Sequence, residues 1–191
     1  LAGLAFLQLD SGDYASAIEA LEKIKTSGVA DRNHLTALAS AYERMGLYKE
    51  ATVVYQELLD HFSRGENPVA IRRGLAHNLV LSGQHKKALK QYEILVEIEH
   101  RNPENHLRLS QLYREQRRFE EAHQSLQKAQ KLAPDSPEIQ YNLVQLFQAE
   151  GSTGKAIEAM EGLLEATSKG KYSSREIQAR VMFLEQLGIL H

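Results

Sequence analysis

The stretch that decides the fold is Pro103–Ser136, which reads PENHLRLSQLYREQRRFEEAHQSLQKAQKLAPDS. Its first half places one set of side chains on a single helical face, at His106, Leu109, Ser110 and Tyr113. Its second half repeats that spacing after a charged interruption, at Phe119, Ala122, Leu126, Ala129 and Leu132. Pro134 then ends the pattern, because proline cannot donate the next backbone bond. The stretch therefore predicts two amphipathic helices joined by a short turn.

The same pattern recurs along the chain. A small residue recurs at steps of 34, 37, 34 and 34 residues, at Ala17, Ala51, Ala88, Ala122 and Ala156. A leucine of the first helix recurs at Leu4, Leu38, Leu75, Leu109 and Leu143. Glycine recurs in the turn at Gly12, Gly46, Gly83 and Gly151, and Arg117 takes its place in the fourth unit. A fixed period of this length indicates stacked repeats, and the longer step indicates an insertion in the loop 63–68.

These positions resemble the tetratricopeptide repeat, a helix-turn-helix unit with the same period. The residues that fill its pattern are His106, Leu109, Ser110, Tyr113, Ala122, Leu126 and Pro134. Two of them depart from it, since the family usually has tryptophan in place of His106 and an aromatic residue in place of Leu126. The resemblance implies an all-α fold, a right-handed superhelical solenoid of antiparallel helix pairs.

We expect a single solenoid over residues 1–191. Its repeats are expected at about 1–31, 32–65, 69–102, 103–136 and 137–170, followed by a last helix or partial repeat over 174–191. Because the chain opens inside a helical pattern, we expect it to be a fragment of a longer repeat protein.

The composition excludes several classes of protein and of functional site. A hydrophobic fraction of 42% is enough for a continuous core between helix layers. The absence of cysteine excludes disulfides, thiolate zinc sites and a cysteine nucleophile, and it is compatible with the cytoplasm and with a bacterial periplasm. No apolar run reaches the roughly 18 residues of a membrane span. The net charge is −2, yet basic residues outnumber acidic ones over 69–136.

Residue patterns for catalysis and metal binding are missing from the sequence. The eight histidines form no pair at i, i+4 and no His-Glu-x-x-His motif, so no metal site is expected. No nucleophile motif or phosphate loop is found either, so we expect neither an enzyme nor a cofactor. The arginines over 101–118 alternate with glutamates and the pI is about 6.5, which argues against nucleic acid as the partner.

The resemblance implies that the first helices of the repeats line a concave groove. Candidate partner-binding residues at those positions are Arg73, His77, Arg108, Gln111, Arg114, Tyr141, Asn142 and Gln145. Further groove positions are Asn33, Thr36, Ser40, Glu43 and Leu107, with Phe6 and Leu9 also on the concave side. Arginine pairs with carboxylates and side-chain amides bond peptide backbone, so we expect a protein or peptide partner of acidic character. The alternative is that the polar candidates are ordinary solvated residues and that Phe6 and Leu9 are surfaces that a preceding repeat would cover.

The leading hypothesis for function is a non-enzymatic scaffold that binds a partner protein or peptide. A narrower version places the scaffold in a bacterial envelope assembly for export or polysaccharide secretion, from a general resemblance to alanine- and glutamine-rich arrays without cysteine. The alternative is a repeat domain appended to an enzyme, positioning a catalytic domain outside this chain. Self-association through the ends of the array is a further hypothesis.

Overall fold

The computed structural model describes residues 2–62 and 68–166, together with positions 182, 185 and 188. In this part of the chain there are ten α-helices and no strand. They are α1 (Ala2–Asp10), α2 (Tyr14–Thr26), α3 (Arg32–Arg44), α4 (Tyr48–Phe62), α5 (Pro68–Leu81), α6 (His85–Ile98), α7 (Pro103–Glu115), α8 (Phe119–Leu132), α9 (Pro137–Glu150) and α10 (Thr153–Ala166). The expected insertion over 63–68 lies outside the described residues except for Pro68, as does the expected last helix over 174–191 apart from positions 182, 185 and 188.

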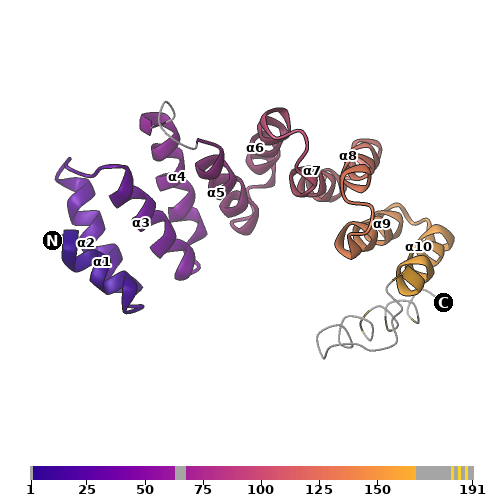
Figure 1. The fold of residues 1–191 in the computed structure, drawn as a ribbon, viewed down its shortest axis with the longest axis horizontal. Coiled ribbons are helices and arrows are strands. Elements are labelled where there is room, and N and C mark those ends of the chain that lie inside the picture. The colour runs from indigo at the N-terminus through magenta and orange to yellow at the C-terminus, as the bar shows by residue number, and fades with distance from the viewer. Residues whose placement is uncertain (1, 63–67, 167–181, 183–184, 186–187, 189–191) are drawn as a thin grey trace. The chain divides into compact units, whose positions relative to one another are not determined.

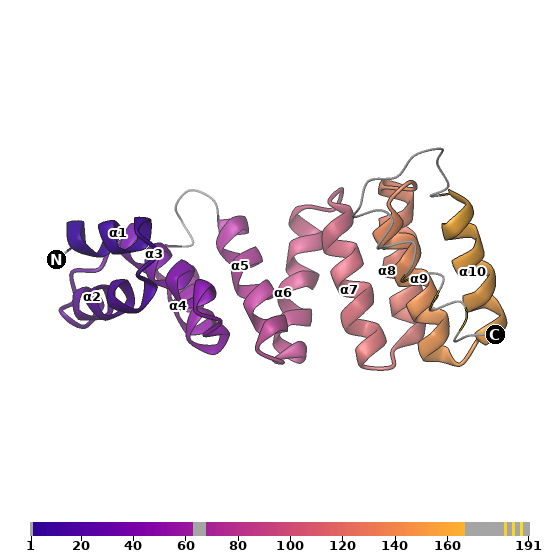
Figure 2. The ribbon, with the colours of Figure 1, turned by 90° about the horizontal axis from the view of Figure 1, so that it is seen from below.

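The helices fall into two compact units. Unit 1 covers Leu1–Ile98 and contains α1 to α6, and unit 2 covers Glu99–His191 and contains α7 to α10. Within a unit, each helix packs against the next, and short turns join α1 to α2, α3 to α4, α5 to α6, α7 to α8 and α9 to α10 (Figures 1 and 2). Short turns oblige neighbouring helices to run antiparallel. The expected all-α solenoid of helix pairs is confirmed.

The recurring small residues form the close contacts of the core. The alanines at the five equivalent positions are all fully buried, at Ala17, Ala51, Ala88, Ala122 and Ala156. The recurring leucines Leu38, Leu75 and Leu109 are buried as well. Leu4 is 57% exposed, so the expectation that it packs like the others is wrong. Helix α1 packs against α2 and α3, and Leu4 lies on its uncovered side.

The turns inside the pairs share one backbone conformation. Gly12, Gly46, Gly83 and Gly151 have φ between 70° and 81°, which glycine adopts without a Cβ clash. Arg117 has φ 59° at the same point of the α7–α8 turn. The backbone bonds there are kept, since the Arg118 N–H donates to the Tyr113 carbonyl at 2.9 Å. The repeat therefore imposes the left-handed conformation even on a residue that disfavours it.

Replacing Arg117 with glycine is expected to stabilise unit 2 by about 1 kcal/mol, because it removes the left-handed strain of a residue with a Cβ. Urea denaturation followed by circular dichroism measures the change. The control is Lys128→Gly in the middle of α8, which should destabilise by about 1 kcal/mol through lost helix propensity. Equal effects of the two substitutions would contradict the assignment of strain to Arg117.

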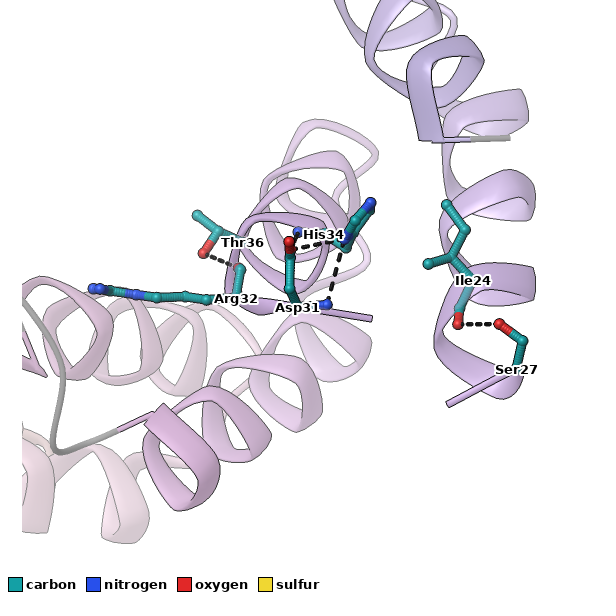
Figure 3. A network of polar contacts seen from close by, with 6 residues as sticks. All are labelled: Ile24, Ser27, Asp31, Arg32, His34 and Thr36. Carbon is teal, nitrogen blue, oxygen red and sulfur yellow. Dashed lines mark hydrogen bonds and ion pairs between the residues drawn. The ribbon is translucent and has the colours of Figure 1, made fainter. Parts of the chain in front are cut away.

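The entry to α3 is fixed by a capping box (Figure 3). The Asp31 carboxylate accepts the backbone N–H of His34 at 2.9 Å, and Nδ1 of His34 accepts the backbone N–H of Asp31 at 3.3 Å. The backbone hydrogen bond from His34 holds the pKa of Asp31 below its ordinary value. One turn later, the Thr36 hydroxyl donates to the Arg32 carbonyl at 2.8 Å. Thr36, an expected groove residue, therefore donates its hydroxyl hydrogen inside α3.

A polar network joins α3, α4 and α5 inside unit 1. The side-chain amide of Asn78 is fully buried and donates to the Glu43 carboxylate and to the Gly74 carbonyl, the latter at 2.9 Å. The Tyr55 hydroxyl also bonds to Glu43, and burial together with this bond raises the pKa of Tyr55 above its ordinary value. Glu43, expected in the groove, therefore serves as an internal acceptor.

Candidate interaction site

The candidate residues of unit 2 lie on two first helices that are side by side, α7 and α9 (Figures 1 and 2). Residues 108, 111 and 114 of α7 are spaced by three, which puts them on neighbouring parts of one face. Residues 141, 142 and 145 of α9 form the corresponding set. The structure thus brings the six candidate residues of unit 2 onto one pair of helices, here called the α7–α9 face.

A continuous chain of polar contacts crosses the α7–α9 face. The Arg108 Nε pairs with Glu104 Oε1 at 2.7 Å, and Arg108 Nη1 donates to Gln111 Oε1 at 3.0 Å. Gln111 Nε2 then donates to Asn142 Oδ1 at 3.0 Å, and Asn142 Nδ2 donates to the Glu138 carbonyl at 2.9 Å. Each amide has one consistent orientation, because its oxygen accepts on one side and its nitrogen donates on the other.

This chain holds Arg108 in place while leaving part of it accessible. Its side chain is 35% exposed, and the described residues engage two of the five N–H donors of the guanidinium. Asn142 differs from Arg108, because it is buried and both ends of its amide are bonded to other residues of the fold. It therefore fixes the position of Gln111 and offers a partner little surface. Leu107 is also buried, in the core cluster with Leu126 and Leu146, so its expected place in the groove is wrong.

Arg114 is the half-buried cation of the same face. Burial lowers the pKa of its guanidinium, while the nearby Glu115 and Tyr141 act in the opposite direction. A guanidinium keeps its charge under such a shift. Within residues 2–62 and 68–166, its side chain makes no hydrogen bond or ion pair. A partly desolvated charge of this kind gains free energy when a carboxylate reaches it.

The remaining candidates of α9 are half-buried beside Arg114 and the polar chain. Tyr141 lies near enough to Arg114 to affect its pKa, and Gln145 lies one turn further along α9. Both combine an apolar stem with a polar end, which suits contact with a peptide.

Arg73 and His77 lie on α5 and belong to unit 1. Both are exposed, and their spacing of four places them on one face of that helix. They therefore form a set of their own, separate from the six candidates of unit 2.

Unit 1 has a groove that the sequence indicated only in part. It has a volume of about 540 Å³ and is lined from α1, α2 and α3 by Phe6, Leu9, Asp10, Tyr14, Asn33, Thr36, Ala37, Ser40 and Arg44. The expected positions Phe6, Leu9, Asn33, Thr36 and Ser40 are thus brought together. The ring of Phe6 also lies 5.9 Å from that of His34. Asp10, Tyr14, Ala37 and Arg44 complete the lining and were not among the expected groove positions.

No group of three or more His, Asp or Glu side chains in the described part of the chain is arranged to hold a metal ion. Over the same residues, no helix combines the length and the apolar character that crossing a bilayer requires.

Two family models match the chain, and both describe the tetratricopeptide repeat. One covers residues 107–171 and the other covers residues 35–61. A search of curated proteins found no match.

Several solved structures are similar in fold. MamA 41-end from Desulfovibrio magneticus RS-1 superposes with a TM-score of 0.73 at 19% identity, over 86% of this chain and 92% of that one. TTC0263, a thermophilic TPR protein in Thermus thermophilus, gives 0.62 at 22% identity, over 96% and 95%. A tetratricopeptide repeat protein from Parabacteroides merdae ATCC 43184 gives 0.77 at 19% identity, over 97% and 72%. At these identities the similarity concerns the fold.

Proposed function

We propose that the chain, whose repeats match the tetratricopeptide repeat models over residues 35–61 and 107–171, is a scaffold for protein–protein interaction and binds an acidic segment of its partner on the α7–α9 face. The observation that carries the proposal is Arg114, a half-buried guanidinium whose side chain has no hydrogen bond or ion pair in the part of the chain that the structure describes. A carboxylate of the partner could pair with this guanidinium without first displacing a hydrogen-bonded side chain of the described residues.

Arg108, which is hydrogen-bonded to Gln111, also favours an acidic partner. Its guanidinium is already oriented by Glu104 and Gln111, so less side-chain entropy is lost when a ligand binds. Glu104, Glu115 and Glu138 lie on the same two helices and disfavour a uniformly acidic ligand. The segment that fits best therefore presents a small number of carboxylates at defined positions.

The test is a titration of a fluorescent peptide with two spaced aspartates, followed by anisotropy. Arg114→Glu is expected to weaken binding by a factor of about 10 to 100, because a hydrogen bond to a charged group is worth about 1.5–3 kcal/mol. Arg114→Met keeps the apolar stem and removes the charge, so it should weaken binding by about tenfold.

The matched control is Arg101→Glu, which makes the same charge change at an exposed residue between α6 and α7. Its binding should stay within about twofold of the unmodified chain, since an exposed charge at a distance is screened. If Arg101→Glu and Arg114→Glu weaken binding equally, net charge and not the α7–α9 face governs the interaction. Circular dichroism confirms that each variant is folded.

A narrower proposal is that the scaffold serves a bacterial envelope assembly for export or polysaccharide secretion. It is supported by the alanine- and glutamine-rich composition of an array without cysteine. Affinity capture with the chain as bait, followed by mass spectrometry, tests it. Capture of export or polysaccharide-synthesis components would support the assignment, and capture of cytoplasmic enzymes alone would contradict it.

A further inference from the structure

Unit 1 has a second groove, on the side of its second helices. This groove, here called the α4–α6 groove, has a volume of about 470 Å³. Helices α4 and α6 both pack on α5, and the space between them is the groove. Two buried residues of α5, Leu75 and Leu79, contribute to its lining. The volume lies within the range of sites that receive ligands.

The two walls of the α4–α6 groove carry opposite charges. The α4 wall contains Glu57 and Asp60, and the α6 wall contains Lys87 and Lys90. Glu57 is paired with Lys25 at 2.9 Å, and Lys87 donates to Gln84 at 2.9 Å. Among the described residues, the Asp60 carboxylate accepts a hydrogen bond only from the neutral amide of Gln56, at 2.9 Å, and Lys90 forms no ion pair with an acidic residue. One acidic and one basic group therefore remain available on opposite walls.

The α4 wall also carries an exposed apolar residue. Val53 is 61% exposed and belongs to the lining of the groove. A β-branched apolar residue at such a position gains free energy when a partner covers it. The groove thus combines an apolar centre with two charged edges, which is the arrangement of a protein interface.

Unit 2 contains the counterpart of this groove and shows what is particular to unit 1. The counterpart is lined from α8 and α9 by His123, Gln124, Leu126, Gln127, Gln130 and Leu143, and its volume is about 260 Å³. Counted from the recurring alanines, Gln124 occupies the position of Val53. His123 is held there by Glu150 at 2.6 Å. Repeat geometry alone therefore makes a groove, whereas the larger volume, the exposed valine and the charged walls belong to unit 1.

We propose that the α4–α6 groove docks an amphipathic helix of a partner protein, with an apolar stripe bordered by basic residues on one edge and acidic residues on the other. The α4 part of the lining extends from residue 52 to residue 61, which is about 14 Å of helix, so the docked segment is about three turns long. Its basic edge faces Asp60 and its acidic edge faces Lys90. This surface is independent of the α7–α9 face, so failure of either proposal leaves the other in place.

The test uses the full chain and synthetic helical peptides of about 14 residues with a leucine stripe, whose central three turns match the length of the groove. One peptide carries lysine on one edge and glutamate on the other, a second carries lysine on both edges, and a third carries glutamate on both. Titration followed by amide NMR should show saturable shifts around Val53 with the mixed peptide. The two single-charge peptides should bind about fivefold more weakly, since each adverse charge contact is worth up to about a factor of five.

Two substitutions at exposed positions distinguish the groove from unspecific adsorption. Val53→Gln installs the residue of the unit 2 counterpart and should weaken the mixed peptide about tenfold, whereas Gln124→Ala should leave it unchanged. Asp60→Lys replaces the available acidic group of the α4 wall with a basic one, so the glutamate-edged peptide should then become the tightest ligand. Circular dichroism verifies that the variants are folded.

Three results would overturn the proposal. The first is equal binding of all three peptides, which would show that the charged walls do not select the ligand. The second is equal binding of a proline-containing peptide that cannot form a helix, which would make the occupant an extended segment. The third is a concentration-dependent shift of the Val53 region without peptide, which would make the occupant a second copy of the chain.

Discussion

Replacing Asn78 with aspartate is expected to destabilise unit 1 by about 3–5 kcal/mol at neutral pH, the cost of an uncompensated buried charge. The Asn78 side chain is fully buried, and its N–H groups donate to two acceptors, the Glu43 carboxylate and the Gly74 carbonyl. A carboxylate at this position has no N–H to donate. It would place a second negative charge against Glu43 in a site that excludes water.

The penalty of Asn78→Asp should depend on pH in a defined direction. Burial and Glu43 raise the pKa of the new carboxyl group in the folded state above its unfolded value of about 3.9. The folded state then binds more protons than the unfolded state between the two pKa values, so stability falls as pH rises through that window. Relative to the unmodified chain, the loss should be smallest near about pH 4 and complete once the folded pKa is exceeded. Urea denaturation at several pH values measures it.

The control is Asn78→Leu, because leucine is the residue at the equivalent positions of unit 2, Leu112 and Leu146. Both of these leucines are buried, which shows that the repeat accepts leucine there. The substitution removes one donor to the Glu43 carboxylate, so it should cost about 1–3 kcal/mol, without the pH dependence that a second carboxyl group introduces. Equal losses for leucine and aspartate at all pH values would show that the network has no electrostatic role.

The sequence predicted the repeat architecture because that architecture depends on local, periodic requirements. A helix pair needs a small residue where its helices approach, and all five alanines at that position are fully buried. A tight turn needs a left-handed residue, and the four predicted glycines adopt it. Such requirements act within about 34 residues and recur, so a single sequence reveals them.

The internal polar contacts were not predictable in the same way. Asn78 reaches Glu43 across 35 residues, and Gln111 reaches Asn142 across 31 residues. Each of these contacts occurs once, between side chains that follow no repeat pattern. The repeat pattern consequently predicted that Glu43 and Asn142 lie in an open groove, whereas the structure shows both bonded within the fold. Which residues remain accessible to a partner therefore depends on side-chain pairing between neighbouring helices.

Replacing Gly74 with alanine is expected to destabilise unit 1 by about 1–3 kcal/mol, although alanine is the better helix former by about 1 kcal/mol. A Cβ at Gly74 would lie 2.6 Å from two ring atoms of Tyr55 and 2.9 Å from its hydroxyl oxygen. These distances are too short for any real contact, so the ring must move. Movement is costly because the Tyr55 hydroxyl is bonded to Glu43 in the same network.

A double-mutant cycle with Tyr55→Ala separates the steric conflict from other effects of the substitution. Once the ring is removed, Gly74→Ala should be neutral or stabilising by up to about 1 kcal/mol, since only helix propensity remains. The matched control is Gly162→Ala on α10, where an added Cβ meets no atom within 4 Å and should stabilise unit 2 by about 0.5–1 kcal/mol. A Gly74→Ala effect that stays the same with and without the Tyr55 ring would contradict this account, because the close approach of α4 and α5 would then not depend on that contact.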